Sequence, residues 1–366
     1  MKVCHMTSAH DNTDTRIFYR ECRSLAAAGY EVYLVAAGES REEAGVRVIG
    51  LGAEPEGRVE RMTKFARRVY EKALSLDCDV YHFHDPELLP YGVKLAKRGK
   101  KVIFDSHENS VAQLACKPYL PHWLAKLASV IYKAYETRCV RRFTAVIIPC
   151  TFDGKNIFEG RAHRTVFVEN YPILSEFGSL DDIVPEERIE SDVCYTGSIT
   201  ENNGIVYLSD AAAALGARLL FAGWFETEKL ERETLAKSDC IRYLGRVDRQ
   251  TIRRILAGTK IGACISLDEG QYYSCDTFGA KVHEYMLAGI PALVSDSPFE
   301  KRMIDEYQFG LYVDPRDTEA VKAAIRRLLD DPDYARKLGE NGRRAALERF
   351  NWSTQEAALL ELYASL

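Results

Sequence analysis

The 366-residue sequence lacks the features that would place it at once in several large classes of protein. Its 49 lysines and arginines are outnumbered by 54 acidic residues, so the whole chain has no basic field for binding nucleic acid. No apolar run approaches the ~20 residues that a membrane-spanning helix needs. The first residues, Met1–His5, lead into polar ones without an apolar core, so we expect no secretory signal.

The cysteines give no sign of a disulfide or metal framework, because none of the ten forms a CxxC pair. Cys4, Cys194 and Cys264 lie in apolar runs, where cysteine usually behaves as a small hydrophobic residue. We therefore expect a reducing cytoplasm as the location of the protein. The sequence also lacks a GxGxxG fingerprint, which disfavours a dinucleotide-dependent dehydrogenase.

What the chain does contain is a repeated alternation of short apolar runs with amphipathic segments, the pattern of parallel α/β sheets. Gly29 is a C-cap signal for a helix over Thr15–Ala28. The predicted strands are Lys2–Met6, Glu31–Ala36, Val80–Phe83, Lys101–Phe104, Thr144–Ile148, Thr165–Val168, Asp192–Thr196, Arg218–Ala222, Ile241–Leu244 and Ile261–Ile265. Further helices are predicted at Gly204–Leu215 and Thr251–Ala257, and two more between residues 318 and 347. The fold class is α/β, with two doubly wound, Rossmann-like halves.

The rhythm breaks once, in a stretch that is rich in glycine, proline and acidic residues. We place a linker there, at 173–191, between an N-terminal domain of residues 1–172 and a C-terminal domain of residues 192–348. Residues 349–366 are predicted to form a final helix.

The most informative segment is 275–291, which follows one predicted strand and precedes another. It places two carboxylates, Asp276 and Glu284, with seven residues between them, and Lys281 one helical turn before Glu284. The start of the helix can present backbone N–H groups and a cation to an anion, while the carboxylates can bind sugar hydroxyls. The segment resembles the signature of the family 4 glycosyltransferases, in which two acids are separated by seven residues.

The resemblance extends from His10 to the final helix and implies the GT-B fold, in which two Rossmann-like domains face each other across a cleft. It implies that Glu284 binds the ribose of a nucleotide-sugar donor and that Asp276 binds hydroxyls of the donor sugar. Lys281, with backbone N–H groups at Phe278 and Gly279, would then stabilise the departing diphosphate.

Asp276 stands where the family signature has glutamate, and two further features of the donor side depart from the family pattern. Many members have an arginine directly after the first glycine of the strand-to-helix turn that begins at Gly197, and a lysine further on. This chain has Ser198 and Asn203 at those places. We therefore expect Gly197 and Ser198 to border the donor, and Lys281, with Arg246 as a weaker candidate, to supply the missing positive charge.

Three polar loops follow predicted strands of the first half, where such sheets bind ligands. The resemblance implies that His107 contacts the transferred sugar. The remaining acceptor-side candidates are His10, Asp14, Arg16, His84, Asp85 and Glu108. Helix capping by Asp14 is an equally simple explanation of the first loop.

The end of the third strand is a candidate metal site, because alternation places His82 and His84 on one face. Asp85 or Glu87 could add a third ligand. Since ligands of one metal ion usually come from several elements, we expect no metal and no other cofactor.

Residues 122–142 form a helical pattern that mixes aromatic and aliphatic residues with five cations. Such a helix can lie on an anionic membrane surface, and ordinary packing against the domain is the alternative. The protein is thus expected in the cytoplasm or at the inner face of the membrane.

The resemblance implies a metal-independent glycosyltransferase that transfers a hexose with retention, with a UDP-sugar as the favoured donor. Its acceptor is a hydroxyl of a glycan or a lipid-linked glycan, as in polysaccharide biosynthesis, and no nucleic acid takes part. A sugar-nucleotide 2-epimerase of GT-B fold and a non-catalytic partner subunit that binds nucleotide sugars remain alternatives.

Overall fold

The computed structural model describes residues 1–116, 121–178, 180, 182–269 and 273–366, which separate into two compact units. The N-terminal unit comprises Met1–Asn170 and Trp352–Leu366, and the C-terminal unit comprises Tyr171–Asn351. Residues 173–191, predicted as a linker, are assigned to the C-terminal unit and include α7 (Leu174–Phe177) and η4 (Pro185–Glu187). Residues 179 and 181 of that stretch lie outside the described residues.

The N-terminal unit is built on a sheet with the strand order β3-β4-β2-β1-β5-β6-β7-β8. Only β3 is antiparallel to its neighbour among the strands that the structure describes. The strands are β1 (Lys2–Asp11), β2 (Glu31–Ala37), β3 (Arg41–Glu43), β4 (Val46–Gly50), β5 (Val80–Phe83), β6 (Lys101–Asp105), β7 (Ala145–Ile148) and β8 (Thr165–Phe167). The helices are η1 (Thr15–Cys22), α1 (Arg23–Ala27), α2 (Arg58–Glu60), η2 (Arg61–Phe65), α3 (Ala66–Ser75), η3 (Pro86–Leu88), α4 (Leu89–Ala96), α5 (Ser110–Ala115) and α6 (His122–Val140).

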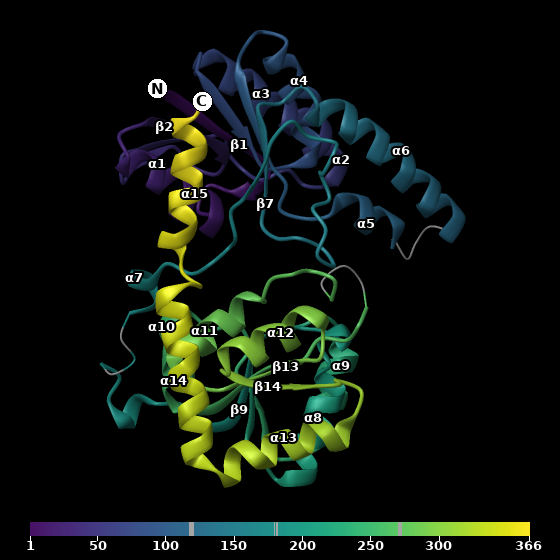
Figure 1. Cartoon of the computed structure of the whole chain (residues 1–366), viewed down its shortest axis with the longest axis vertical. Helices are drawn as coiled ribbons and strands as arrows, with labels where there is room; N and C mark the ends of the chain where they lie inside the picture. The colour runs from purple at the N-terminus through teal and green to yellow at the C-terminus, as the bar shows by residue number, and fades with distance from the viewer. Residues whose placement is uncertain (117–120, 179, 181, 270–272) are drawn as a thin grey trace. The chain divides into compact units, whose positions relative to one another are not determined.

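The two faces of this sheet are buried by different partners. Cys4 and Met6 of β1 point into the main apolar core, as period-2 alternation requires. The intervening residue, His5, points to the opposite face, where it meets η1 and the last helix, α15 (Trp352–Ala364). Figure 1 shows α15 beside the first elements of the chain, and the Trp352 indole donates a 2.9 Å hydrogen bond to the hydroxyl of Ser24.

The C-terminal unit has an entirely parallel sheet in the order β11-β10-β9-β12-β13-β14. Its strands are β9 (Ser191–Ile199), β10 (Leu219–Phe225), β11 (Ile241–Tyr243), β12 (Thr259–Cys264), β13 (Ala292–Ser295) and β14 (Gly310–Val313). Its helices include η5 (Glu201–Asn203), α8 (Ile205–Leu215), α9 (Glu228–Leu235), α10 (Arg249–Gly258), α11 (Ala280–Ala288), α12 (Pro298–Tyr307), α13 (Thr318–Asp330) and α14 (Pro332–Glu348). Val193 and Cys194 belong to cores on opposite faces, so helices cover both sides of the sheet.

These observations confirm the predicted class of two α/β units with parallel sheets. The strand order reverses direction beside β1 in one unit and beside β9 in the other. Ligands of doubly wound sheets bind outside the carboxyl ends of strands at such switch points. A ligand site is therefore expected at the carboxyl ends of β1 and β5 in the N-terminal unit, and at those of β9 and β12 in the C-terminal unit.

Not every element was anticipated. The short strands β3 and β4 escaped prediction because β3 reads Arg-Glu-Glu and β4 is only half-buried at its end. The strand β14 escaped as well. Among the helices, none in the described parts of the chain has both the length and the apolar character to cross a membrane.

Candidate active site

In the N-terminal unit, the loops after β1, β5 and β6 meet at the switch point and are fixed by buried carboxylates. Asp85 accepts hydrogen bonds from the hydroxyl of Thr7 at 2.8 Å and from the backbone N–H groups of Ser8 at 2.6 Å and Ala9 at 3.2 Å. One Asp85 oxygen therefore holds the end of β1 against the end of β5. This contact accounts for a carboxylate at that position without any ligand.

The second carboxylate, Asp105, ends β6 and is fully buried. The Arg16 guanidinium grips it with two hydrogen bonds of 2.8 and 3.0 Å, and also donates to the carbonyl of Val168 at 2.9 Å. Burial alone would raise the pKa of Asp105, but Arg16, followed by His107, holds it well below its usual range. Arg16, predicted on the acceptor side, is itself buried in this pair.

A pocket of about 410 Å³ lies beside Ser8 and Ala9, and a larger one of about 730 Å³ opens beside it in the same unit. The larger pocket gathers many of the residues proposed for the acceptor side. Its lining includes His10, His84, Asp85, His107 and Glu108, together with Met62, Leu114, Tyr132 and Tyr135. Asp14 and Arg16 are not part of this lining. A pocket of this size, apolar with a few convergent polar groups, suits a sugar-sized organic molecule.

Two histidines connect the pocket to the buried interior. The Nδ1 atom of His84 lies 3.1 Å from Nε2 of His107 and 3.3 Å from an oxygen of Asp105. Burial lowers the pKa of His84 to about 4, so its imidazole is neutral near pH 7. His107 lies in the pocket wall with its side chain 18% exposed. His84 and Asp105 contact its Nε2 from the buried side and orient the ring.

His10 lies at the mouth of the pocket between two carboxylates. Its Nδ1 is 3.3 Å from Asp14 and its Nε2 is 3.5 Å from Asp85. Burial lowers the pKa of His10, but the hydrogen bond that His10 donates to Asp14 and the charges of Asp85 and Asp14 outweigh burial and raise the pKa. Asp14 also caps η1 by accepting from the N–H groups of Arg16 and Ile17, so the capping alternative is confirmed.

In the C-terminal unit, the end of β9 meets the start of α11. Gly197 has a φ of +108°, and an added Cβ atom there would lie 3.6 Å from Cε and 3.8 Å from Nζ of Lys281. Lys281 donates a 3.0 Å hydrogen bond to the hydroxyl of Tyr195, which in turn donates to the carbonyl of Ser198 at 2.8 Å. Burial would lower the pKa of Lys281, but Cys264 and Tyr195 raise it, so the ammonium stays charged.

Four other residues predicted for the donor side lie in the same unit as Lys281. Gly279 is the N-cap of α11, and Phe278 is buried beneath it against Phe299 and Phe309. Glu284 pairs with Arg249 at the start of α10. The Arg246 guanidinium stacks 4.5 Å from the centroid of the Trp224 ring.

The remaining three positions complete the donor side. Asp276 is half-buried just before α11, and Ser198 is half-buried at the end of β9. Asn203 accepts a 2.7 Å hydrogen bond from the hydroxyl of Thr200 within the turn before α8. The structure therefore brings Lys281 beside Gly197 in the C-terminal unit, and it brings His10, His84, Asp85, His107 and Glu108 to one pocket in the N-terminal unit.

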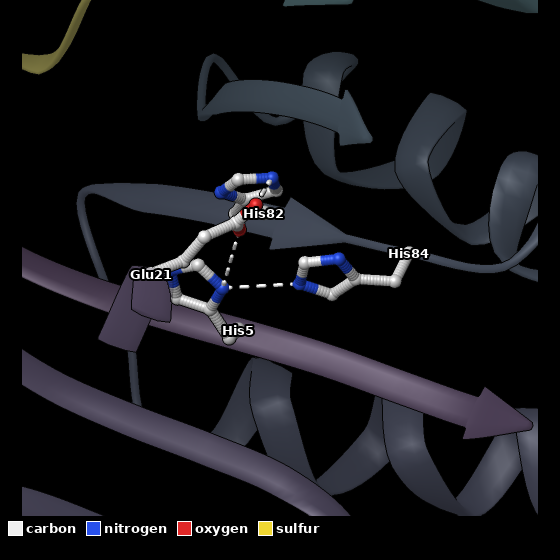
Figure 2. Close-up of side chains that lie close together, drawn as sticks. All are labelled: His5, Glu21, His82 and His84. Atoms are coloured by element: carbon white, nitrogen blue, oxygen red, sulfur yellow. Dashed lines mark hydrogen bonds and ion pairs between the residues drawn. The ribbon is translucent and has the colours of Figure 1, made fainter. Parts of the chain in front are cut away.

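Two of the residues able to hold a metal ion, His82 and His84, are those considered from the sequence, and the other two are not. His82 and His84 do share one face, as alternation predicted, with ring centroids 4.7 Å apart. Glu87 instead pairs with Arg61, and Asp85 is occupied by the β1 loop, so neither joins them. The groups that do are His5 from β1 and Glu21 from η1, and Figure 2 shows all four side chains pointing toward one another. We call these four residues the His–Glu cluster.

Sequence reasoning missed several members of these groups. Tyr195 gave no signal beyond its place two residues before Gly197. Arg249 lies outside the predicted helix Thr251–Ala257, whereas the observed α10 begins at Arg249. Glu21 sits among alternating polar and apolar residues of a helix, and nothing in that pattern marks it as fully buried.

Comparisons with family models cover nearly the whole chain. A model described as glycosyl transferases group 1 matches residues 182–345, and one described as Glycosyltransferase Family 4 matches residues 15–170. Over 138 residues the chain is 30% identical to the MMP alpha-(1->4)-mannosyltransferase of Mycolicibacterium hassiacum, covering 37% of this chain and 32% of that protein. It is 27% identical over 191 residues to the alpha-maltose-1-phosphate synthase of Mycolicibacterium smegmatis, covering 47% of each. These matches span a third to a half of the length of those relatives.

Solved structures resemble the chain over its full length. The sucrose-phosphate synthase of Thermosynechococcus elongatus gives a TM-score of 0.78 at 20% identity, covering 100% of this chain and 99% of that one. The Anabaena Alr3699/HepE complex with UDP and glucose gives a TM-score of 0.73 at 13% identity, covering 100% of both. At this identity the likeness shows the fold alone, which is GT-B.

Proposed function

The chain belongs to the family 4 glycosyltransferases of GT-B fold, and from this premise we propose that it moves a sugar from a nucleoside-diphosphate donor to an acceptor hydroxyl. We further propose that the anomeric configuration is retained, that no metal takes part in the transfer and that the donor is a UDP-sugar. The UDP named for Anabaena Alr3699/HepE supports that donor.

The observation that carries the proposal is the Lys281 ammonium beside Gly197. When the bond between the sugar and the diphosphate breaks, negative charge grows on the leaving phosphate, and its stabilisation is usually the largest catalytic contribution. Lys281 and the N–H groups at the start of α11 supply positive potential at one point. This arrangement substitutes for the arginine and lysine that many family members have at the positions of Ser198 and Asn203.

The other donor-side roles follow from the same placement. Glu284 lies on the same helix as Lys281 and accepts hydrogen bonds from the hydroxyls of the donor ribose. Arg249 forms an ion pair with the Glu284 carboxylate and holds it in place. Asp276 accepts hydrogen bonds from hydroxyls of the donor sugar. Gly197 leaves the space next to the Lys281 ammonium free of a side chain.

The acceptor side is the 730 Å³ pocket of the N-terminal unit. His107 contacts the transferred sugar, and Glu108 with His10 contacts acceptor hydroxyls. The exposed face of α6 suits an acceptor at a membrane surface, because Trp123, Val130 and Ile131 are each more than 60% exposed. Its cations Lys126, Lys133 and Arg138 are exposed as well, as are Arg141 and Arg142 just after the helix.

The deciding experiment measures release of the nucleotide from a panel of labelled UDP- and GDP-sugars. We expect Lys281→Ala to lower kcat by about 10²–10³-fold, while Lys322→Ala, a lysine on α13 paired with Glu319, matches the unaltered chain. A Lys281→Ala enzyme as active as the unaltered one would end this account of the leaving group.

The same panel separates the alternatives. Conversion of the donor into its epimeric nucleotide sugar, without an acceptor and without net release of nucleotide, favours the epimerase. Binding without turnover, across all donors and with glycan and lipid-linked acceptors, favours a partner subunit, an alternative that the absence of charge at Ser198 and Asn203 keeps open.

A further inference from the structure

The His–Glu cluster lies in the interior of the N-terminal unit, on the face of the sheet that η1 and α15 cover. His5 and His82 are register partners on the adjacent strands β1 and β5, and their ring centroids are 4.4 Å apart. His5, Glu21 and His82 are fully buried, and His84 is 2% exposed. The proposed sugar transfer gives no role to His5, Glu21 or His82.

The ligand atoms converge at distances that suit a metal ion. Nδ1 of His5 lies 3.0 Å from Nε2 of His84 and 3.9 Å from an oxygen of Glu21, and Nε2 of His82 lies 3.7 Å from that oxygen. All four atoms lie within 4.8 Å of one another. Tetrahedral zinc with bonds near 2.1 Å separates its ligands by about 3.4 Å, so small side-chain adjustments close the site.

The cluster also contains buried polar atoms that nothing satisfies. Both carboxylate oxygens of Glu21 and Nε2 of His82 have no hydrogen-bond partner among the described residues. Orphaned groups of this kind are rare in the interior of proteins and call for an unseen ion or proton. Arg16 approaches Glu21 at 3.2 Å, but it is shared with Asp105, so one positive charge faces two carboxylates.

The second nitrogens of the imidazoles have partners of the kind that support metal ligands. Nδ1 of His84 faces Asp105 at 3.3 Å, and Nδ1 of His82 faces the hydroxyl of Tyr363 at 2.9 Å. A carboxylate or oxygen behind the imidazole orients the ring and raises its basicity toward the metal. Each of the three rings presents one nitrogen to the cluster, and the neutral imidazole is the form that binds metals.

We propose that the His–Glu cluster is a closed, four-ligand structural site for a divalent transition metal ion, with zinc as the best fit to three imidazoles and one carboxylate. The ion ties β1, η1 and β5 together beneath α15. It does not contact the donor, so the metal-independence proposed for sugar transfer is unaffected. By occupying Nε2 of His84, it leaves the proton on Nδ1, directed at Asp105 and His107.

The rival explanation is a proton in place of the ion. Burial, followed by the nearby Asp105 carboxylate, raises the pKa of Glu21 well above its usual range, so a neutral Glu21 is the state expected without a metal. The two explanations differ for Glu21→Gln. A glutamine replaces a protonated carboxyl with little change, but it removes the anionic ligand that a metal requires.

The test is the metal content of the purified full chain, measured by mass spectrometry after growth with added zinc and exchange into chelator-free buffer. We expect about one zinc ion per chain in the unaltered protein and in His122→Gln, whose histidine is exposed at the start of α6. Glu21→Gln and His82→Gln should hold less than roughly a tenth of that amount.

A second measurement needs no variant and decides the matter if a variant fails to fold. Protein produced with cobalt instead of zinc should show the strong visible absorption of four-coordinate cobalt. Less than roughly a tenth of an ion per chain from both media, or full loading of Glu21→Gln, overturns the proposal. Because the readout is metal content, its failure leaves the proposed sugar transfer standing.

Discussion

The ammonium of Lys281 lies 3.0 Å from the hydroxyl oxygen of Tyr195 and 4.3 Å from the centroid of the Tyr195 ring. The two residues come from α11 and β9 of the same unit, 86 positions apart in the chain. The hydroxyl accepts from Lys281 and donates to the carbonyl of Ser198. Tyr195 thus orients Lys281, the cation proposed to stabilise the leaving diphosphate, and it also orients the end of β9 beside Lys281.

Tyr195→Phe should therefore lower kcat by about tenfold, less than the loss for Lys281→Ala, because the ring contact remains and only the hydrogen bond is lost. The measurement is kcat and KM for the donor in the nucleotide-release assay. Tyr334→Phe on α14 is the control, since its ring stacks on Arg327 away from β9. An unchanged kcat would show that Lys281 does not depend on Tyr195 for its position.

Gly197→Ala should weaken donor binding. Its φ of +108° is unfavourable for alanine, and the added Cβ would occupy space beside Lys281 that the diphosphate needs. Gly216→Ala is the matched control, because Gly216 also has a positive φ, of +63°, but has nothing within 4 Å of an added Cβ. Both variants should lose about 1–2 kcal/mol of stability, and only Gly197→Ala should raise KM for the donor. Equal kinetics of the two variants would place the diphosphate elsewhere.

The parts of the site that sequence could predict are those encoded by neighbouring residues. The segment from Asp276 to Pro291 carries its own stop signal, and the observed helix α11 ends at Ala288 with Gly289 in the left-handed conformation. Alternation along β5 correctly placed His82 and His84 on one face. Such local patterns depend only on the geometry of a single strand or helix.

The parts that escaped prediction depend on elements that meet only in the fold. Glu21 reaches His82 at 3.7 Å across 61 positions of sequence, from 21 to 82, because η1 packs over β5. The neighbours of His84 in sequence, Asp85 and Glu87, were the only third ligands that the local pattern offered, and in the fold those carboxylates contact the β1 loop and Arg61. Long-range pairing of this kind leaves no periodic signal in the sequence.

The pKa of His10 should depend on Asp14. In Asp14→Asn the charge is removed while the amide oxygen still caps η1, so the pKa of His10 should fall. A raised folded-state pKa stabilises the protein below the unfolded pKa of about 6.5, and this contribution is lost as pH rises through the folded pKa. The variant should thus lose more stability at pH 6 than at pH 9.

Nuclear magnetic resonance titration of the His10 ring and unfolding at the two pH values check this prediction. Asp11→Asn, which caps Thr13 nearby but makes no ion pair with His10 among the described residues, is the control. A His10 pKa that stays the same in Asp14→Asn would contradict the assigned cause.

The exposed face of α6 should bind anionic membranes. We expect the chain to sediment with liposomes that contain an anionic phospholipid, and we expect added salt to weaken this binding because the Debye length shrinks to about 8 Å at 0.15 M. Lys126→Glu combined with Lys133→Glu should reduce binding, and Arg336→Glu on α14 should not. The absence of sedimentation at low salt would leave α6 without a membrane role.

Glu300 on α12 should make stability depend on pH near neutrality. Burial raises the pKa of its carboxyl to about 7, although Ser297 and Ser295 lower it, and Ser297 donates to it at 3.0 Å. Because the folded-state pKa is raised, the stabilising contribution is complete below the unfolded pKa of about 4.3 and disappears as pH rises through 7. The ionised carboxylate at pH 8 is therefore destabilising.

Glu300→Gln removes that ionisation while its amide oxygen still accepts the hydrogen bond from Ser297. Relative to the unaltered chain, the variant should gain about 1–2 kcal/mol between pH 5 and pH 8, a value reduced because the side chain is partly exposed to solvent. Denaturant unfolding at both pH values measures the gain. Glu306→Gln, an exposed position on the same helix, should show no such change. An equal effect of Glu300→Gln at both pH values would mean that Glu300 is ionised throughout, and the capping hydrogen bond from Ser297 would then outweigh the cost of burying its charge.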